Sequence, residues 1–166
     1  MIVAIDVLYS NGMSHVAALA FNDWNSEEVK SRYSLSVECY SEYIAGQFYL
    51  REMRPILAIL EQLTDEVEIL VIDGYCYLDA SERKGLGAHL YGAIDEKCPI
   101  IGVAKNPYQG SPHAVHLLRG ESKKPLFITA VGISQQKASE YIAQMAGSFR
   151  IPTLLKEVDA MSREHR

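Results

Sequence analysis

The chain has few cysteines, and it has no long apolar run. A transmembrane helix needs about 18 or more consecutive apolar residues, and none of the 166 residues fall in such a stretch, so we expect no membrane span. The three cysteines, Cys39, Cys76 and Cys98, form no Cys-x-x-Cys pair and suit a reducing cytoplasm as ordinary small apolar residues. Met1 leads directly into an apolar run without a basic flank, so we expect no signal peptide and a cytoplasmic location.

The chain also lacks an excess of positive charge, since its formal net charge is −5. It is not basic enough to coat nucleic acid indiscriminately, so any nucleic-acid binding should be directed to one site. Residues 1–82 contain 14 acidic and 4 basic side chains, whereas residues 83–166 contain 7 acidic and 12 basic ones. Either this is a chance distribution over a solvated surface, or metal-binding carboxylates lie in the first half and phosphate-facing cations in the second. The candidate cations are Arg83, Lys84, Lys105, Arg119, Lys123 and Lys124.

Hydrophobic patterning predicts one α/β domain over residues 1–166. Asn11-Gly12 is a hairpin signal between the first two strands, Pro55 starts or kinks the first helix, and Ser134 is a good N-cap for the last helix. The tail from Ile151 should pack along the domain. The expected strands are 2–9, 13–21, 29–39, 67–72, 99–104, 115–118 and 126–130, and the expected helices are 45–63, 86–94 and 134–145. This order is typical of a mixed sheet with helices on its faces.

Three carboxylates stand out because of where they lie in this pattern. Asp6 and Asp73 each end an apolar, β-branched run that reads as a buried strand, and Glu52 lies in an amphipathic stretch. A carboxylate at the end of a buried strand must be paired, hydrogen-bonded or bound to a metal. If the two strands are neighbours, their carboxylates point to one spot, and like charges about 3 Å apart cannot all stay ionised unaided. A divalent cation would solve this, which favours a metal-dependent phosphodiester enzyme over simple capping or turn formation.

Residues 43–52 resemble the Y-I-P-G-x-x-x-x-R-E motif of the endonuclease V family. Further segments resemble other motifs of that family in the same order. They are 71–74 (the strand with the second aspartate), 85–90 (G-L-A-S-H-L), 100–105 (I-G-V-A-K), 125–128 (P-L-Y-V) and 150–152 with Asp159 (R-L-P and A-D). The gaps of 46 residues from Asp6 to Glu52 and 21 residues from Glu52 to Asp73 also suit the family. The resemblance covers nearly the whole chain.

This resemblance implies an RNase H-like fold, and cleavage of DNA or RNA near deaminated purines, chiefly inosine. Cleavage would fall one nucleotide to the 3′ side of the altered base and would use Mg²⁺ or Mn²⁺. By resemblance, Asp6 and Asp73 would hold the metal, and Glu52 would bind it or position its water. Lys105 would lie near the scissile phosphate, where a point charge is useful.

The resemblance also implies a set of nucleic-acid contacts. Tyr43 with Ile44 would form a wedge that fills the gap left by a flipped base. Gly46, Gly74 and Gly85 would let the backbone approach that base, because glycine has no side chain in the way. His89, at the start of a helix, is either structural or in contact with nucleic acid.

Four departures place the chain in a divergent branch of that family. Residues 129–134 contain no histidine where the family carries S-x-G-H, and no H-P-R follows Asp73. Ala45 replaces the second proline of the wedge, and the region between Lys105 and Pro125 is shorter than usual. These departures keep two alternatives open: a module that binds altered nucleic acid without cleaving it, and a metal nuclease with another target, such as unusual single strands or RNA ends.

Several polar side chains near the site have two interpretations at this stage. His113 and His116 are either surface residues or one of them replaces the missing histidine. Tyr75 and Tyr77 either pack half-buried or stack on a base. Asp79 would add a ligand or repel phosphate. The sequence does not decide between DNA and RNA, and it leaves the oligomeric state open.

Overall fold

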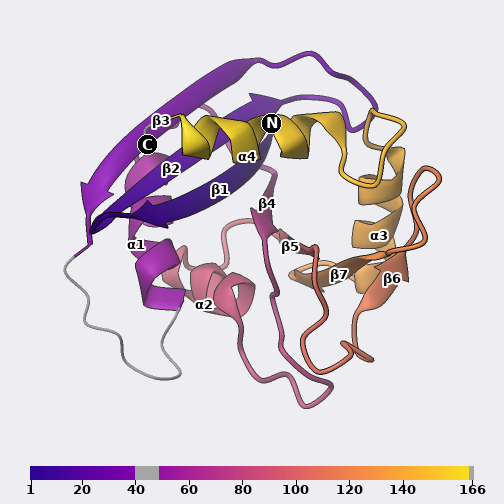
Figure 1. Cartoon of the computed structure of the whole chain (residues 1–166). Helices are drawn as coiled ribbons and strands as arrows, with labels where there is room; N and C mark the ends of the chain where they lie inside the picture. Colours follow the sequence, from indigo (N-terminus) through magenta and orange to yellow (C-terminus); the bar gives the residue numbers. More distant parts are fainter. Residues whose placement is uncertain (40–48, 165–166) are drawn as a thin grey trace.

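The computed structural model describes residues 1–39 and 49–164 of the chain. The seven strands in that part form one sheet in the order β3-β2-β1-β4-β5-β7-β6 (Figure 1). The strands are β1 (Ile2–Ser10), β2 (Met13–Phe21), β3 (Ser31–Glu38), β4 (Ile69–Asp73), β5 (Ile100–Ala104), β6 (Val115–Leu117) and β7 (Leu126–Val131). The helices are α1 (Tyr49–Leu60), α2 (Leu86–Ala93), α3 (Gln135–Gln144) and α4 (Thr153–Arg163). Every expected strand is present, within a few residues of its expected bounds.

The three central strands run in the same direction, and this decides where the site lies. β1 pairs with β4 in parallel, with Ile5 opposite Ile72, and β4 pairs with β5 in parallel, with Asp73 opposite Val103. The outer pairs, β1 with β2, β2 with β3, β5 with β7 and β6 with β7, are antiparallel. β1 continues beside β2 to Ser10, but its pairing with β4 ends at Ile5, so Asp6 in the middle of β1 lies at the same edge as Asp73 and Lys105, where β4 and β5 end.

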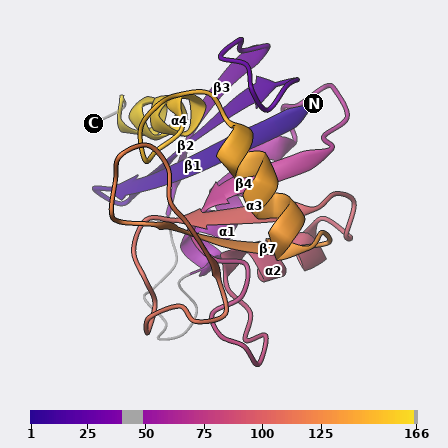
Figure 2. The ribbon, with the colours of Figure 1, turned by 90° about the vertical axis from the view of Figure 1, so that its right-hand side faces the viewer.

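Helices cover both faces of the sheet, which confirms the expected mixed α/β architecture (Figures 1 and 2). Side chains alternate between faces along a strand. Ile2 and Ala4 of β1 therefore pack in the core beneath α3 and α4, while Val3 and Ile5 pack in the core beneath α1 and α2. Asp6 continues the first of these series, so its side chain points toward the α4 face.

The first helix carries its proline inside rather than at its start. α1 is already helical at Tyr49, and Pro55 is buried within it. A proline has no N–H, so the carbonyl one turn earlier loses its helical partner. That carbonyl belongs to Arg51, and the Ser14 hydroxyl of β2 reaches it at 3.5 Å. Ser14 of β2 thus contacts the Arg51 carbonyl, which has no helical hydrogen bond because of Pro55. Residues 45–48 of the expected helix lie outside the described residues.

The tail packs along the domain as expected, but it does so as a helix that the sequence analysis did not predict. α4 lies over β1 and β2 with Leu154, Val158 and Met161 buried beneath it. Pro152 precedes the helix and supplies no side-chain cap, so the usual start signal is missing. The i, i+4, i+7 spacing of the buried residues was nevertheless present in the sequence. None of the helices in the described part of the chain is long and apolar enough to cross a membrane.

Arg119, one of the candidate phosphate-facing cations, is a structural residue. It is only 7% exposed, and its guanidinium donates to four backbone carbonyls between α3 and α4. The acceptors are Met145 (2.6 Å), Gly147 (3.1 Å), Phe149 (2.6 Å) and Arg150 (3.3 Å). This replaces the expectation that Arg119 faces phosphate. The physical reason is that a buried guanidinium needs acceptors for its donors, and the α3–α4 connection supplies them.

We predict that Arg119→Leu lowers the free energy of unfolding by about 2–4 kcal/mol, because several buried carbonyls lose a charged donor. Urea denaturation followed by circular dichroism measures this. The control is Arg32→Leu, which removes an exposed ion pair with Glu157 (2.7 Å) and should cost less than about 1 kcal/mol. Equal losses in the two variants would show that the carbonyl contacts of Arg119 contribute little.

Candidate active site

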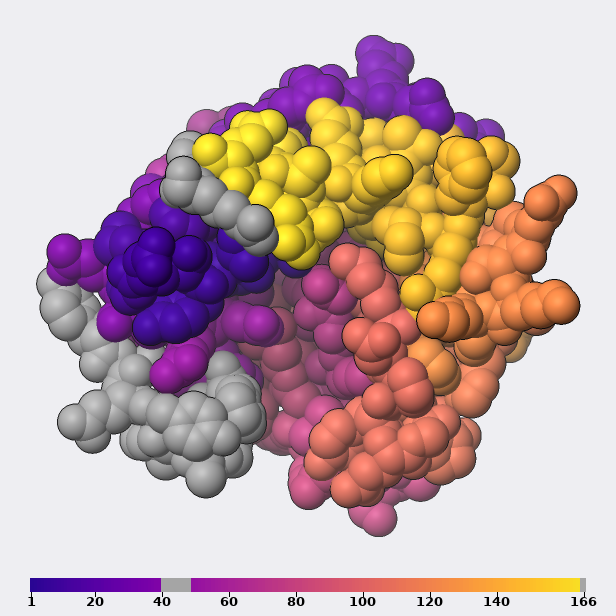
Figure 3. Space-filling model, viewed as in Figure 1, coloured from indigo at the N-terminus to yellow at the C-terminus, as the bar shows by residue number. Residues whose placement is uncertain are grey.

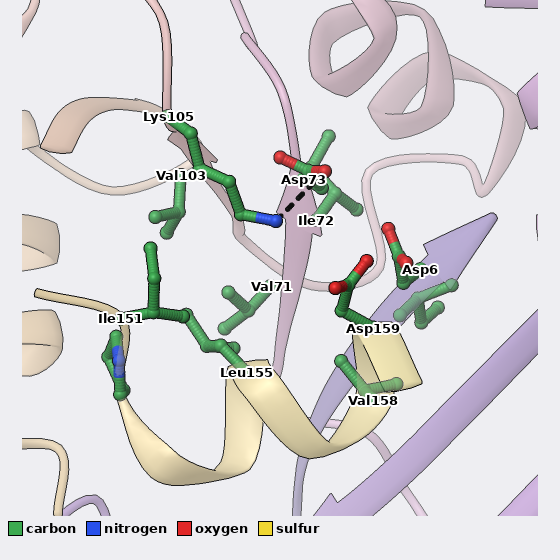
Figure 4. Close-up of a pocket in the computed structure, with 12 residues that line it drawn as sticks. Asp6, Val71, Ile72, Asp73, Val103, Lys105, Ile151, Leu155, Val158 and Asp159 are labelled. Carbon is green, nitrogen blue, oxygen red and sulfur yellow. Dashed lines mark ion pairs between the residues drawn. The ribbon is translucent and has the colours of Figure 1, made fainter. Parts of the chain in front are cut away.

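Asp6 and Asp159 form the buried corner of a recess at the edge of the sheet. Asp6 is the residue of β1 that points toward α4, and it is 8% exposed. The Ser162 hydroxyl of α4 lies 2.8 Å from Asp6 Oδ2 and 2.8 Å from the Asp159 carbonyl, so it can donate to either. The Asp159 carboxylate points into the same recess (Figure 4), and Arg163 one turn later contacts it at 3.2 Å. α4 thus brings a second carboxylate to Asp6.

Asp73 and Lys105 form the other side of this recess. They follow the parallel strands β4 and β5, and Lys105 Nζ lies 3.8 Å from Asp73 Oδ2 (Figure 4). Both side chains are partly exposed, 46% for Asp73 and 34% for Lys105. The recess floor is apolar, formed by Val71, Val103 and residues of α4. The space-filling view shows this face hollowed below α4 (Figure 3).

Glu52 approaches the two strand-end aspartates from the opposite face of the sheet. It lies in the first turn of α1, and it lines a second, adjoining recess together with Asp6 and Asp73. Its side chain is exposed at the mouth of that recess. The expected trio therefore shares one region, although Glu52 belongs to the helix layer opposite α4. Parallel pairing of β1 and β4 places Asp6 and Asp73 at one edge of the sheet, and α1 brings Glu52 to the same region.

Burial is the main reason why three of the four carboxylates have raised pKa values. Burial, followed by the charge of Asp73, raises the pKa of Asp6 to about 7, against a smaller lowering by the Ser162 hydrogen bond. Burial and then the charges of Asp73 and Asp6 raise the pKa of Glu52 to about 7. Burial also raises the pKa of Asp73, while Lys105 opposes it. The pKa of Asp159 is lowered, because its hydrogen bonds with Arg163 and Asp6 outweigh its desolvation.

The chemistry of this set fits a hard divalent cation. Asp6, Asp73 and Asp159 offer only carboxylate oxygens, the ligands that Mg²⁺ and Mn²⁺ prefer. Asp6 and Asp159 lie close enough for each to shift the pKa of the other, so a cation beside both would stabilise their charged forms. In residues 1–39 and 49–164, no three His, Cys, Asp or Glu side chains are already gathered as a ligand cluster. Lys105 is the cation that accompanies Asp73 in this arrangement.

The predicted nucleic-acid residues are only partly described. Tyr43, Ile44 and Gly46 lie outside the described residues. Gly74 follows Asp73 with φ +126°, a conformation that favours glycine. A Cβ at Gly85 would lie 2.6 Å from the Tyr75 carbonyl, so Gly85 permits tight packing of the chain after Asp73. Close backbone packing therefore explains Gly85, and its predicted contact with a base stays a prediction.

The aromatic and imidazole side chains near the site are engaged in packing. His89 is half-buried and stacks on Tyr49, with ring centroids 3.6 Å apart. His113 donates from Nε2 to the Tyr77 carbonyl (2.7 Å), and His116 does so to the Ser111 carbonyl (2.9 Å). Neither is among the residues that line the two recesses, so neither replaces the missing histidine in this arrangement.

Tyr75 packs, as one of its two interpretations expected, and Asp79 has a role that the sequence analysis did not consider. The Tyr75 hydroxyl donates to the Asn106 carbonyl (2.7 Å) and contacts the Ser111 hydroxyl (2.6 Å), which ties the chain after β4 to the loop after β5. Asp79 accepts from the Ser81 and Arg83 amides at 3.0 and 3.1 Å. Asp79 therefore closes a turn, and it is not among the residues that line the recesses.

The sequence analysis assigned no role to Asp159, Ser162 or Arg150. Asp159 was noted only as part of a family motif, because the helix that delivers it had not been predicted. Arg150 donates to the carbonyls of Lys105 and Pro125 (2.8 Å for the latter). It thereby fixes the backbone of Lys105 where β5 leaves the sheet. Ile151 and Pro152 continue this segment along the wall of the recess (Figure 4).

Comparisons with known proteins point to one family over most of the chain. The sequence model of the family described as Endonuclease V matches residues 1–124. Endonuclease V from Pyrococcus abyssi is 36% identical over 112 residues, which is 67% of this chain and 54% of that protein. The alignment thus spans about half the length of the Pyrococcus protein. The Gloeobacter violaceus Endonuclease V is 35% identical over 79 residues, which is 48% of this chain and 31% of that protein.

Solved structures show the same fold. The Streptomyces avermitilis Endonuclease V superposes with a TM-score of 0.80 and 27% identity, over 99% of this chain and 80% of that one. The Ciona intestinalis Endonuclease V, in complex with a 23mer DNA containing an inosine followed by a ribo-adenosine, gives a TM-score of 0.84 at 18% identity, over 99% and 84% of the two chains. These matches confirm the RNase H-like fold that the resemblance implied.

We predict that, without divalent metal, the protein becomes less stable as pH rises from about 4 to about 7. Buried Asp6 has a folded pKa of about 7, so the folded chain retains a proton that the unfolded chain has released. Glu52 acts in the same direction, but it contributes less because its exposed surface is screened by solvent. Between pH 5.5 and pH 8, Tm measured in EDTA should fall by about 5 °C or more.

The control is Asp6→Asn, which cannot ionise, so its Tm should depend less on pH and exceed that of the wild type at pH 8. The lowered pKa of His89 makes the protein more stable as pH rises near 6. Because wild type and Asp6→Asn share this effect, it cancels when their Tm values are compared. The lowered pKa of Asp159 acts at pH below about 4. Identical pH profiles for wild type and Asp6→Asn would contradict the prediction.

Proposed function

Because the chain belongs to the endonuclease V family, we propose that it is a metal-dependent endonuclease that hydrolyses a phosphodiester bond near a deaminated base, chiefly inosine, in DNA or RNA. The observation that supports this best is the convergence of Asp6, Asp73 and Asp159 on one recess, with Glu52 on its other side. A surplus of carboxylates with raised pKa values is typical of a functional site.

Each side chain of the site has a role in this proposal. Asp6, Asp73 and Asp159 would hold a Mg²⁺ or Mn²⁺ ion, which when bound supplies an activated water and neutralises charge growing on the phosphate. Glu52, with a pKa of about 7, is suited to orient the attacking water and accept its proton near neutral pH. Lys105 would leave Asp73 and place its ammonium against a phosphate oxygen.

The substrate is proposed from relatives and from the character of the recess. The Ciona protein binds DNA containing an inosine followed by a ribo-adenosine. The Asp73–Lys105 pair is open to solvent, so a phosphate can reach it without opening the core. Both DNA and RNA remain within the proposal, because no described contact here is specific to a sugar.

A second candidate is a protein that binds altered nucleic acid without cleaving it. It is favoured by the absence of histidine from residues 129–134, and by the fact that the carboxylates of the described residues are not gathered as a ligand cluster. Inosine-dependent binding without cleavage in Mg²⁺ or Mn²⁺ would select this candidate. Cleavage of single strands or RNA ends without regard to inosine would instead select a metal nuclease with another target.

We predict that Asp73→Asn reduces cleavage of an inosine-containing oligonucleotide by at least about a thousandfold, since a neutral amide cannot neutralise a cation. Labelled DNA and RNA strands, each with inosine or adenosine at one position, are incubated with Mg²⁺, Mn²⁺ or EDTA. The control is Asp23→Asn, because Asp23 is exposed just after β2, at the sheet edge opposite Asp6. Equal cleavage by wild type and Asp73→Asn would overturn the catalytic assignment.

We also predict that millimolar Mg²⁺ or Mn²⁺ raises the Tm of the wild-type protein at pH 8, by about 5 °C if the ion is present at a hundred times its dissociation constant. The rise should disappear in Asp6→Asn and remain in Asp23→Asn. A thermal melt reports binding even if the protein does not cleave. A Tm that does not respond to either ion would contradict a metal site formed by these carboxylates.

A further inference from the structure

Two large apolar side chains are strongly exposed where the loop after β6 meets the connection between α3 and α4. Phe149 is 75% exposed and Leu118 is 62% exposed, and the third large apolar side chain that is exposed in the described part of the chain, Tyr9, is only 46% exposed. The segments that carry Phe149 and Leu118 are held together. Arg119 donates to the Phe149 carbonyl at 2.6 Å, and a Cβ at Gly120 would lie 3.2 Å from the Phe149 Cα. A buried guanidinium, on the residue after Leu118, therefore fixes the backbone that carries Phe149.

Two lysines follow on the same loop. Lys123 and Lys124 are exposed, and neither makes an ion pair with any residue that the structure describes. Glu121 is the one acidic side chain among loop residues 120–124. We call Leu118, Phe149, Lys123 and Lys124 the Phe149 surface. It combines two exposed apolar groups with two cations that form no ion pair within residues 1–39 and 49–164.

The Phe149 surface continues directly into the recess. Phe149 precedes Arg150, whose guanidinium holds the Lys105 backbone, and it lies two residues before Ile151, which lines the recess. Two trans peptide units span at most about 7 Å. The Cα atom that carries the exposed ring therefore lies within about 7 Å of the Cα of Ile151 at the recess wall. A strand that leaves a phosphate at Lys105 along this wall passes the Phe149 backbone.

We infer that the Phe149 surface binds the substrate strand next to the scissile phosphate, with a base stacked on Phe149 and Leu118 and with phosphates paired to Lys123 and Lys124. The inference rests on the proposed function and extends it by naming a second contact region. Aromatic side chains stack on bases of any sequence, and lysines follow the backbone.

A nucleic-acid strand suits this surface better than a protein partner does. Two apolar side chains are far smaller than the roughly 800 Å² that each partner of a stable protein interface buries. The chain is acidic overall, with a net charge of −5, so a pair of unneutralised lysines beside an exposed ring is a local exception. That exception adjoins the recess proposed to hold a phosphate.

The test is binding of a fluorescein-labelled inosine-containing oligonucleotide, measured by anisotropy with Asp73→Asn protein so that no cleavage is needed. Adding Phe149→Ala should weaken binding about 5- to 30-fold, and Phe149→Trp should restore it, because stacking and not shape carries the contact. Replacing both Lys123 and Lys124 by Ala should reduce the slope of log affinity against log salt by about 1.4 to 1.8. Lys97→Ala is the matched control, since Lys97 is exposed before β5, at the opposite sheet edge from Lys105.

Shortening the oligonucleotide from either end locates the contact. The effect of Phe149→Ala should vanish once the strand is too short to reach the surface, while binding at the recess remains. An effect that is independent of strand length, or a salt slope that is unchanged in the lysine variant, overturns the inference. So does a wild-type dimer, detected by light scattering, that Leu118→Ser dissociates.

The outcomes separate this inference from the proposed function. Wild-type cleavage with unaltered binding by Phe149→Ala keeps the nuclease and removes the Phe149 surface. Binding that depends on Phe149 without cleavage by the wild type keeps the surface and favours the binding-only candidate. No binding of any oligonucleotide removes both.

Discussion

Repulsion between carboxylates at one edge of the sheet is the constraint on which the rest of the site depends. Parallel pairing of β1 with β4 puts Asp6 beside Asp73, and α4 adds Asp159 from above. Such a cluster is destabilising unless protons or cations compensate it. In the structure the compensation is local: Ser162 donates toward Asp6, Lys105 lies beside Asp73, and Arg163 pairs with Asp159. Each compensating group stands next to the carboxylate that a bound cation would also stabilise.

The sequence could predict the parts of the site that depend on strand pattern. Asp6 and Asp73 end short β-branched runs, and this local signal places both at one edge of the sheet once the strands are neighbours, although only Asp6 is buried. Asp159 could not be placed in the same way, because α4 starts after Pro152 without a capping side chain. Its apolar spacing was readable, but helical periodicity alone does not show which face of which sheet a helix will cover.

Composition could not distinguish structural from accessible cations in the second half of the chain, where others, such as Arg83 and Arg163, form ion pairs with aspartates. Arg119 and Arg150 donate to backbone carbonyls, so their charge stabilises the α3–α4 connection and the end of β5. Lys105 and the lysines of the Phe149 surface stay accessible. This division follows from side-chain chemistry, because a guanidinium has five donors that can satisfy several carbonyls, whereas an ammonium is a compact, strongly hydrated charge. The uneven charge of the sequence therefore has a structural component as well as a proposed functional one.

The missing histidine changes the character of the proposed metal site. His113 and His116 bond to carbonyls of their own loop region, and neither lines the recesses formed by the described residues. Among the residues that the structure describes, the donors that converge on the recess are carboxylates together with the Ser162 hydroxyl, whereas His165 lies outside the described residues. Oxygen donors favour Mg²⁺ and Mn²⁺, whereas imidazole and thiolate ligands favour softer ions such as Zn²⁺. The departure from the family pattern thus favours a site that prefers hard cations such as Mg²⁺ and Mn²⁺. The raised pKa of Asp6 implies that such a site binds its ion better as pH rises, since protons and cations compete for the same oxygens.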